Sequence, residues 1–196
     1  MTAHPSLSVC TNEQRARFDA NGRELDCLIV GGGPAGLTAA LYLARFERHS
    51  LVVDAGEPRA SWIPTSHNVP VFAEGISGRD LLARQREHVR RYGVPVLPGT
   101  VTEIGKGPDG FVTRIDADGG TREVKARRVL LATGAIDVEP DLPDLPNAVR
   151  RGLVRYCPIC DGFESRGKRI AVIGFGDRGL ARRCSSPAPT RATSPC

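Results

Sequence analysis

The sequence lacks the compositional features of several protein classes. Aromatic residues make up only 5% of its 196 residues, which gives little support for the base-stacking surfaces of nucleic-acid-binding proteins. Neither sign of charge dominates, because 27 Lys and Arg residues stand against 22 Asp and Glu residues. The hydrophobic share of 40% is too high for a chain that is disordered throughout. The composition therefore favours a globular protein with a weak preference for acidic or phosphate-bearing ligands and no nucleic-acid partner.

Long uninterrupted apolar runs are also missing. The most apolar segment, residues 25–44, is broken by Gly-Gly-Gly-Pro at 31–34 and by Gly36, so it would make a poor lipid-exposed helix. The first 24 residues are polar and charged and have no apolar core of the kind that a signal peptide needs. We therefore expect a cytoplasmic protein with no membrane partner.

Six cysteines are too few for a dense disulfide framework, and only Cys157 and Cys160 lie close together, in Cys-Pro-Ile-Cys. Two thiols with this spacing can close and reopen a small disulfide. Asp161 follows directly and could move a proton to or from a departing thiolate. A zinc site would need a second such pair or histidines at ligand spacing, and the sequence has neither. The pair predicts redox chemistry, with zinc binding and inert cysteines as the alternatives, and we expect no metal.

The spacing of apolar residues predicts an α/β protein. Strands are expected at 25–30 and 51–53 with a helix at 34–45 between them, which makes a βαβ unit. A long connection at 55–78 leads to a second helix. The remaining elements are a helix at 78–92, strands at 94–97 and 129–132, a β-meander at 100–104, 111–116 and 122–125, and a strand at 169–173 after a proline-rich linker at 138–146.

Gly31, Gly33 and Gly36 form the pattern Gly-x-Gly-x-x-Gly between the first strand and the first helix. In a dinucleotide-binding fold the first glycine allows a tight turn, the second lets a pyrophosphate approach the backbone, and the third lets helix and strand pack closely. The N-terminus of the helix supplies amide donors for the phosphates. Asp54 ends the second strand, where a carboxylate can accept hydrogen bonds from a ribose. The pattern predicts dinucleotide binding rather than a purely structural turn.

A second glycine pattern, Gly174, Gly176 and Gly179, follows the strand expected at 169–173. Its helix cannot extend far, because prolines at 187 and 189 remove backbone donors and clash with the preceding turn. No second strand or ribose-binding acid follows. The pattern predicts the start of a second nucleotide-binding domain. For the irregular residues 181–196, a shift of reading frame is one hypothesis.

Four segments carry a resemblance to a known family. They are Gly-Gly-Gly-Pro-Ala-Gly at 31–36, Leu-Ala-Thr-Gly-Ala at 131–135, Cys-Pro-Ile-Cys-Asp-Gly at 157–162 and Val-Ile-Gly-Phe-Gly-Asp at 172–177. In this order they resemble the low-molecular-weight thioredoxin reductases, which are pyridine nucleotide-disulfide oxidoreductases. The match covers about residues 25–180. The resemblance implies a polar arm at 1–24, a Rossmann-like FAD-binding domain with its β-meander at 25–137, the linker, the dithiol and the start of a Rossmann-like NADPH-binding domain at 138–180, and a tail at 181–196.

The resemblance also implies an activity, in which electrons pass from NADPH through FAD to the dithiol and on to a thioredoxin-like protein or a small disulfide. Cys157 would attack or release the substrate disulfide, Cys160 would face the flavin, and Asp161 would act as the acid/base. The family is typically homodimeric. The cofactor-binding residues implied are Gly31, Gly33, Pro34, Ala35, Gly36, Asp54, Asn68, Ala132, Thr133 and Gly134 for FAD, and Gly174, Gly176 and Gly179 for NADPH.

Two departures from the family leave alternatives open. The loop Ser66-His67-Asn68 differs from the most familiar reductases, which leaves open a relative that acts as a flavin-dependent dithiol oxidase and delivers electrons to oxygen. For His67 and Asn68 the two alternatives are a role facing the flavin and a hydrogen bond that stabilises the loop. The arginine-bearing segment that recognises the NADPH 2′-phosphate and the C-terminal return to the FAD domain are not in the sequence. We therefore expect a truncated chain, with a catalytically inactive flavin-binding fragment as the alternative.

Overall fold

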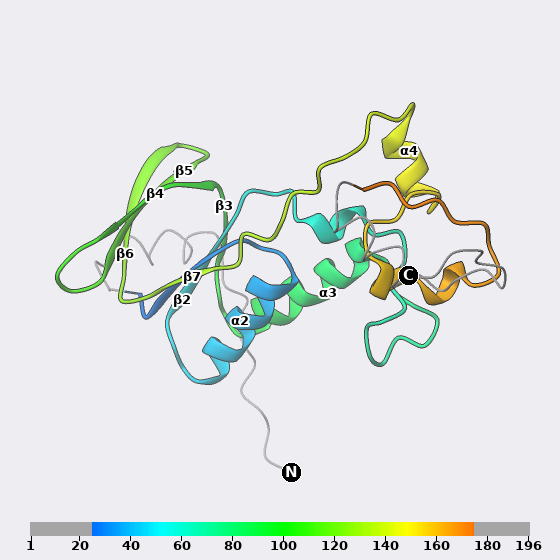
Figure 1. Ribbon diagram of the computed structural model, residues 1–196. Coiled ribbons are helices and arrows are strands. Elements are labelled where there is room, and N and C mark those ends of the chain that lie inside the picture. The colour runs from blue at the N-terminus through cyan, green and yellow to red at the C-terminus, as the bar shows by residue number, and fades with distance from the viewer. Residues whose placement is uncertain (1–24, 175–196) are drawn as a thin grey trace, which may run out of the picture. The chain divides into compact units, whose positions relative to one another are not determined.

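The computed structural model describes residues 25–174, which form two units. Unit 1 comprises residues 25–61 and 80–135, and unit 2 comprises residues 62–79 and 136–174. Unit 1 holds both β-sheets and most of the two long helices (Figure 1). Unit 2 holds three short helical segments and the close cysteine pair.

A four-stranded parallel sheet lies at the centre of unit 1. Its strands are β3 (Val96–Pro98), β2 (Ser50–Asp54), β1 (Cys27–Val30) and β7 (Val129–Leu131), in that spatial order. Leu28 pairs with Leu51 on one side and with Val129 on the other. Parallel strands that are covered on both faces are apolar along their whole length, which explains why these short strands were predictable from continuous apolar runs.

The helices α2 (Pro34–Arg45) and α3 (Gly78–Arg91) lie side by side in unit 1 (Figure 1). The helix α2 packs against β1 and β2 and buries Leu37 and Ala40, while α3 buries Leu82 and Val89. Residues three, four and seven apart share a helix face, so each helix buries one stripe. The Gln85 side chain of α3 donates a hydrogen bond to the Thr38 hydroxyl of α2 at 3.4 Å.

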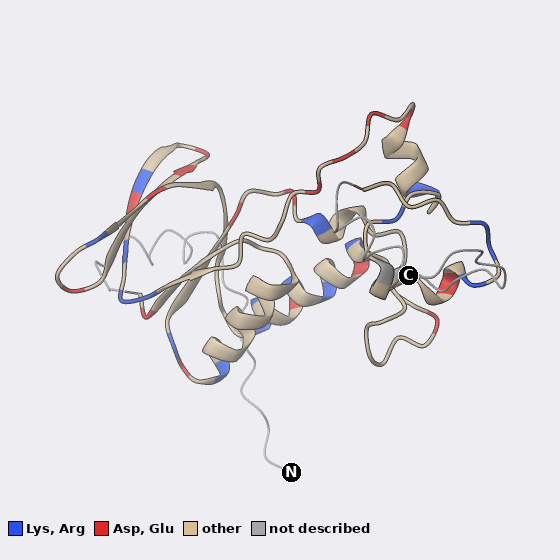
Figure 2. Ribbon diagram, in the orientation of Figure 1, with Lys and Arg blue, Asp and Glu red and all other residues tan. Residues whose placement is uncertain are grey.

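The strands β4 (Thr100–Lys106), β5 (Phe111–Ala117) and β6 (Gly120–Ala126) form an antiparallel meander. Alternate residues of these strands point to opposite faces. Ile115 and Val124 enter a core that Leu28, Leu51 and Val53 of the parallel sheet also form. Both signs of charge line the meander (Figure 2), and on β5 the Arg114 guanidinium lies 2.6 Å from the Glu103 carboxylate.

The structure confirms the α/β class, the βαβ unit, the helix at 34–45 and the meander. The strand expected at 25–30 begins at Cys27 instead. Leu25 forms a separate bridge to Ala126, with its amide donating to the Lys125 carbonyl and its carbonyl accepting from the Arg127 amide. The backbone hydrogen bonds of Leu25 thus join the meander and not β2, which shortens the strand.

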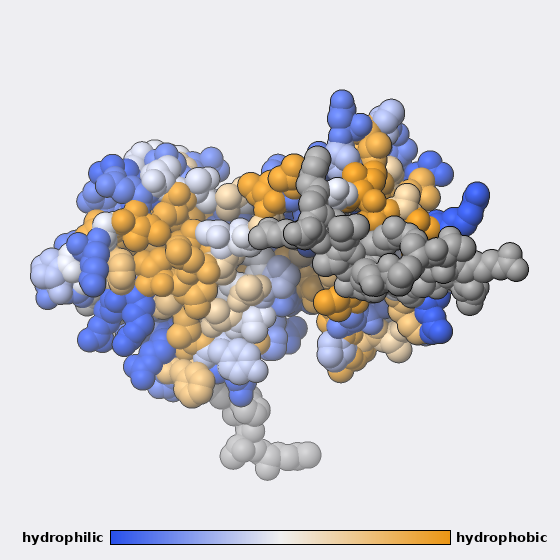
Figure 3. Space-filling view, viewed as in Figure 1, coloured by the Kyte–Doolittle hydropathy of each residue, from blue (hydrophilic) through white to orange (hydrophobic). Residues whose placement is uncertain are grey.

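Unit 2 contains α4 (Leu145–Arg150), α5 (Pro158–Asp161) and the 3₁₀ turn η2 (Phe163–Ser165). The 3₁₀ turn η1 (Arg59–Trp62) lies mostly in unit 1 and ends at the first residue of unit 2. The strand expected at 169–173 is wrong, because no strand of the described residues pairs with this segment. A strand needs a neighbour for its backbone hydrogen bonds. The segment also lacks the burial that its apolar pattern suggested, since Ile173 is 59% exposed. Hydrophobic residues also reach the surface around α4 (Figure 3).

Candidate functional site

In the turn after β1, the fold requires glycine at two positions. Gly31 has a φ of +116°, which L side chains rarely adopt, and a Cβ there would overlap the carbonyl oxygen of Ala132. A Cβ at Gly36 would overlap the carbonyl oxygen of Gly31. The Gly31 amide donates to the Val53 carbonyl at 2.8 Å, which ties the turn to β2. These two glycines therefore let strand, helix and crossover pack together, whether or not a ligand binds.

Gly33 is different, because its surroundings leave room. It is the N-cap residue of α2 in an extended conformation, and a Cβ there would meet only the Pro58 Cβ at 3.7 Å. Helix geometry leaves the first amides of α2 without intrahelical partners, and these belong to Ala35 and Gly36, since Pro34 has no N–H. The first turn of α2 carries no acidic residue. The turn can therefore accept an anion at Gly33 and the following amides.

Asp54 lies directly beside this turn. Asp54 is the last residue of β2 and is buried, with only 8% of its surface exposed. A Cβ at Gly32 would overlap the Asp54 carboxylate, so Gly32 has a role that the sequence pattern did not reveal. The carboxylate accepts hydrogen bonds from the Gly56 amide at 3.0 Å and from Arg86 Nη2 at 2.8 Å.

Two cavities adjoin the Asp54 carboxylate in unit 1. One has a volume of about 370 Å³ and extends between the end of β2 and the turn of the meander at 116–118. The other has a volume of about 480 Å³ and is lined by Arg86, Glu87 and Arg90 of α3 together with Val96 of β3. Both also include Gly56. Asp54 therefore lines space that a ligand can enter, while no residue of the glycine turn at 31–36 lines either of these two cavities.

The segment after β7 lies against the same turn. The Ala132 amide donates to the Val30 carbonyl at 2.8 Å, and its carbonyl closes over Gly31. Thr133 and Gly134 follow at the surface, with Gly134 at a φ of +74°. The structure thus brings the expected crossover residues, the first glycine and Asp54 to one edge of the parallel sheet.

Cys157 and Cys160 form a disulfide in unit 2, with their Cα atoms 5.3 Å apart. Cys157 precedes α5, and its sulfur accepts a hydrogen bond from the Cys160 amide at 3.2 Å. Asp161 is the last residue of α5. The helical turn brings the two sulfurs together, and a disulfide of this spacing can open to two thiols and close again.

The chain matches the family model described as "Pyridine nucleotide-disulphide oxidoreductase" over residues 25–181. It belongs to this family. A relative named thioredoxin reductase, from Bacillus subtilis, is 35% identical over 154 residues, which cover 78% of this chain and 47% of the relative. The chain therefore spans about half the length of the curated relatives that it matches.

Solved structures of similar proteins match the fold as well. The thioredoxin reductase of Streptococcus pyogenes is 32% identical with a TM-score of 0.62, and the match covers 71% of this chain and 44% of that one. An oxidoreductase from Agrobacterium tumefaciens is 35% identical with a TM-score of 0.60, covering 74% and 48%. The parallel sheet and meander thus belong to an architecture found in thioredoxin reductases of this family.

The loop at 62–79 belongs to the same unit as the dithiol. The buried Ser66 hydroxyl donates to the Asn68 amide oxygen at 2.7 Å, and an isolated bridge pairs Ser66 with Ile76. This is the loop-stabilising hydrogen bond; a contact between Asn68 and a flavin stays a prediction. His67 Nδ1 lies 3.5 Å from the Glu164 carboxylate of η2, so the loop contacts the segment that follows the cysteines. Sequence spacing gave no signal for Glu164.

The structure describes only the first residue of the second glycine pattern. Gly174 is the last described residue, and Gly176 and Gly179 lie outside the described residues. Within residues 25–174, no cluster of three or more His, Cys, Asp or Glu side chains could hold a metal ion. The same residues include no helix that is long and apolar enough to cross a membrane.

Proposed function

We propose that this chain carries the FAD-binding turn and the redox dithiol of an FAD- and NADPH-dependent disulfide reductase of the thioredoxin reductase type. The observation that carries the proposal is the Cys157–Cys160 disulfide in a chain of this family. A disulfide closed across two intervening residues accepts two electrons and two protons and can form again. The names of the similar proteins from Bacillus subtilis and Streptococcus pyogenes support the same class of reaction.

The residues of unit 1 fit the adenosine diphosphate part of FAD. A Cβ at Gly33 would meet only the Pro58 Cβ, at ordinary van der Waals distance, and the amides of Ala35 and Gly36 are suited to phosphate oxygens. Asp54 presents an acceptor for ribose hydroxyls beside the turn. Gly31, Pro34, Ala132, Thr133 and Gly134 complete the proposed FAD-binding set of unit 1. Asn68 belongs to unit 2, and its contact with a flavin is a separate prediction from the sequence. When bound, FAD supplies two-electron transfer between NADPH and the disulfide.

The dithiol carries the chemistry with the substrate. Reduction of the disulfide adds two electrons and two protons and yields the Cys157 and Cys160 thiols. The Cys157 thiolate then attacks one sulfur of the substrate disulfide, forms a mixed disulfide and expels the other sulfur as a thiolate. The Cys160 thiolate attacks the mixed disulfide, re-forms the intramolecular disulfide and releases the second substrate thiol. Asp161, which directly follows Cys160, is proposed to transfer the protons.

The nicotinamide cofactor and the partner are further parts of the proposal. Gly174, Gly176 and Gly179 are the residues proposed to receive the pyrophosphate of NADPH. A thioredoxin-like protein or a small disulfide is the proposed substrate, which the relatives named thioredoxin reductase support. A cytoplasmic location and a homodimer are proposed only from the family resemblance of the sequence.

The test combines cofactor binding with anaerobic reduction. The purified chain should bind added FAD, and NADPH should bleach the visible flavin absorption and reduce an added disulfide. Replacing Cys157 or Cys160 by Ser should abolish disulfide reduction and leave FAD affinity unchanged, while Cys27→Ser serves as the matched control. Unchanged turnover in the Cys157 and Cys160 variants would contradict the dithiol assignment.

A second set of conditions separates a reductase from a dithiol oxidase. If a small dithiol bleaches the flavin and oxygen restores its colour with no contribution from NADPH, electrons run from dithiol to oxygen and the proposed direction is wrong. If the purified chain binds no FAD at all, the cofactor assignment for the turn at 31–36 fails.

A further inference from the structure

The Arg86 side chain joins α3 to Asp54, the predicted ribose-binding acid. Its Nη2 atom donates to Asp54 Oδ2 at 2.8 Å. The Arg86 side chain is 40% exposed and the Asp54 side chain 10% exposed. The pair therefore places a partly exposed arginine side chain against a nearly buried carboxylate, and both residues line the cavity of about 480 Å³.

Burial makes the orientation of Asp54 dependent on its donors. A carboxylate removed from water is stable only when hydrogen-bond donors or opposite charges replace the lost hydration. In this structure the two donors bind different oxygens, the Gly56 amide Oδ1 and Arg86 Oδ2. Each oxygen is thereby fixed by one donor. Without Arg86, the Gly56 amide alone would hold the carboxylate.

The fixed carboxylate keeps acceptor capacity for a ligand. Each carboxylate oxygen can accept about two hydrogen bonds, and among the described residues each accepts one. A ribose diol donates to such acceptors, and its hydroxyl oxygens can also accept from a guanidinium, which has five N–H donors. The two side chains thus present complementary acceptor and donor groups at one cavity wall.

We propose that Arg86 is a positioning residue that orients Asp54 toward the ribose 2′-hydroxyl of the bound dinucleotide and thereby sets the discrimination for that hydroxyl. The inference rests on the proposed function, because it assigns Arg86 to the same adenosine site. It goes beyond the glycine pattern, since Arg86 lies 32 positions after Asp54 on another element.

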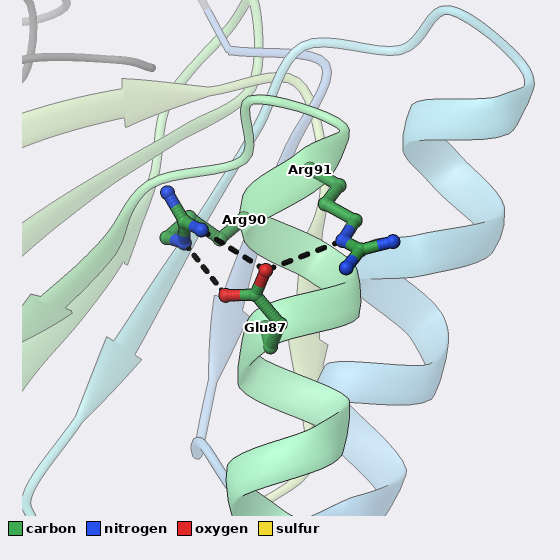
Figure 4. Close-up of polar contacts among 3 residues, drawn as sticks. All are labelled: Glu87, Arg90 and Arg91. Carbon is green, nitrogen blue, oxygen red and sulfur yellow. Dashed lines mark hydrogen bonds and ion pairs between the residues drawn. The ribbon is translucent and has the colours of Figure 1, made fainter. Parts of the chain in front are cut away.

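The same helix offers a matched control. Glu87 forms ion pairs with both Arg90 and Arg91, at 2.8 Å and 3.2 Å, and the two guanidiniums approach opposite sides of its carboxylate (Figure 4). Arg91 is 69% exposed and does not line either cavity. Exposed pairs of this kind contribute little to stability. Arg91→Leu therefore removes the same charge from α3 without touching Asp54.

The experiment compares two probes, ADP and 2′-deoxy-ADP, as ligands of the full chain by isothermal titration calorimetry. The wild-type chain should bind ADP about 10- to 100-fold more tightly, which is the range for a hydrogen bond to a charged group. Arg86→Leu should reduce this ratio to about 3-fold or less. Arg86→Lys should retain most of the discrimination, because the ammonium can still donate to Asp54. Arg91→Leu should leave the ratio unchanged.

The ratio of the affinities for ADP and 2′-deoxy-ADP distinguishes a role of Arg86 in positioning Asp54 from a general structural role. A purely structural defect weakens both nucleotides equally, so an unchanged ratio in Arg86→Leu overturns the inference while leaving the proposed function intact. If Arg86→Leu does not fold, Arg86→Gln provides the same measurement, and failure of both variants to fold assigns Arg86 to the fold and not to recognition. Absence of any ADP or FAD binding by the wild-type chain overturns the inference and the cofactor assignment together.

Discussion

Two single substitutions in the glycine turn should separate the demands of the fold from those of a ligand. Gly31 has a φ of +116°, and a Cβ there would overlap the Ala132 carbonyl oxygen. Gly33 has a φ of −79°, and a Cβ there would lie 3.7 Å from Pro58, which is ordinary van der Waals contact. Gly31→Ala should therefore damage the fold, whereas Gly33→Ala should leave it intact.

The expected free energies follow from these geometries. For Gly31→Ala, the left-handed backbone costs about 1–3 kcal/mol, and relief of the overlap with Ala132 costs about 1–3 kcal/mol more. That sum is a large part of the roughly 5–15 kcal/mol that stabilises a domain. For Gly33→Ala, the less flexible unfolded chain contributes about 0.4–1 kcal/mol, and the poorer N-cap offsets a similar amount. Its stability should stay within about 1 kcal/mol of the wild type.

Ligand binding should respond in the opposite way. The methyl group of Gly33→Ala occupies the space where the backbone would face a pyrophosphate, so FAD affinity should fall about 10- to 100-fold. Urea unfolding without ligand measures the stability of each variant, and quenching of flavin fluorescence measures its FAD affinity. Wild-type FAD affinity in Gly33→Ala would refute the assignment of this turn to the pyrophosphate. Wild-type stability in Gly31→Ala would refute the packing argument.

Three further outcomes test the core and its ionisable groups. Leu28→Ala should lower the free energy of unfolding in urea by about 2–5 kcal/mol, because Leu28 is fully buried between two strands; a loss under about 1 kcal/mol would contradict this. A hydrogen bond from the His49 backbone amide lowers the pKa of Asp26 below 3.8, so its stabilising effect is present above that pH and is lost as the pH falls further. Asp26→Asn should therefore flatten the acid side of the stability curve, and an unchanged curve would argue against the shift. Burial raises the pKa of the Cys27 thiol, so after reduction iodoacetamide should label Cys157 and Cys160 before Cys27, as peptide mass spectrometry can check.

The elements of unit 1 were predictable because their signals are local. The helix at 34–45 has its start at Pro34 and its buried stripe in one short stretch, and the structure has the same bounds. The meander was predictable from alternation and from glycine turns such as that at 118–120. Strand ends were less accurate, because the partner decides them: Leu25 bonds to the meander and not to β2.

Parts of the site depend on contacts that no local pattern records. The ion-pair partner of Asp54 is 32 positions away on α3. Several arginines occur on that helix, and the sequence alone does not distinguish Arg86 from the others. Gly32 lies between the motif glycines and has its own contact with the Asp54 carboxylate. At 169–173 the sequence predicted a strand that the structure does not show. An apolar run forms a strand only when a neighbouring strand is available for pairing.

The contacts of the individual glycines also change what the motif itself can prove. Gly31 and Gly36 are needed because backbone atoms of the same chain occupy the space of their missing side chains. Selection for the fold alone would keep both, so neither is evidence for a ligand. Gly33 and Asp54 carry that evidence, since no close contact within the described residues demands a glycine at 33 and Asp54 holds a buried carboxylate at a cavity wall. Family membership and cofactor binding are therefore separable properties of this chain. Substitution at Gly33 or Arg86 tests cofactor binding, whereas substitution at Gly31 or Gly36 also perturbs the packing of the fold.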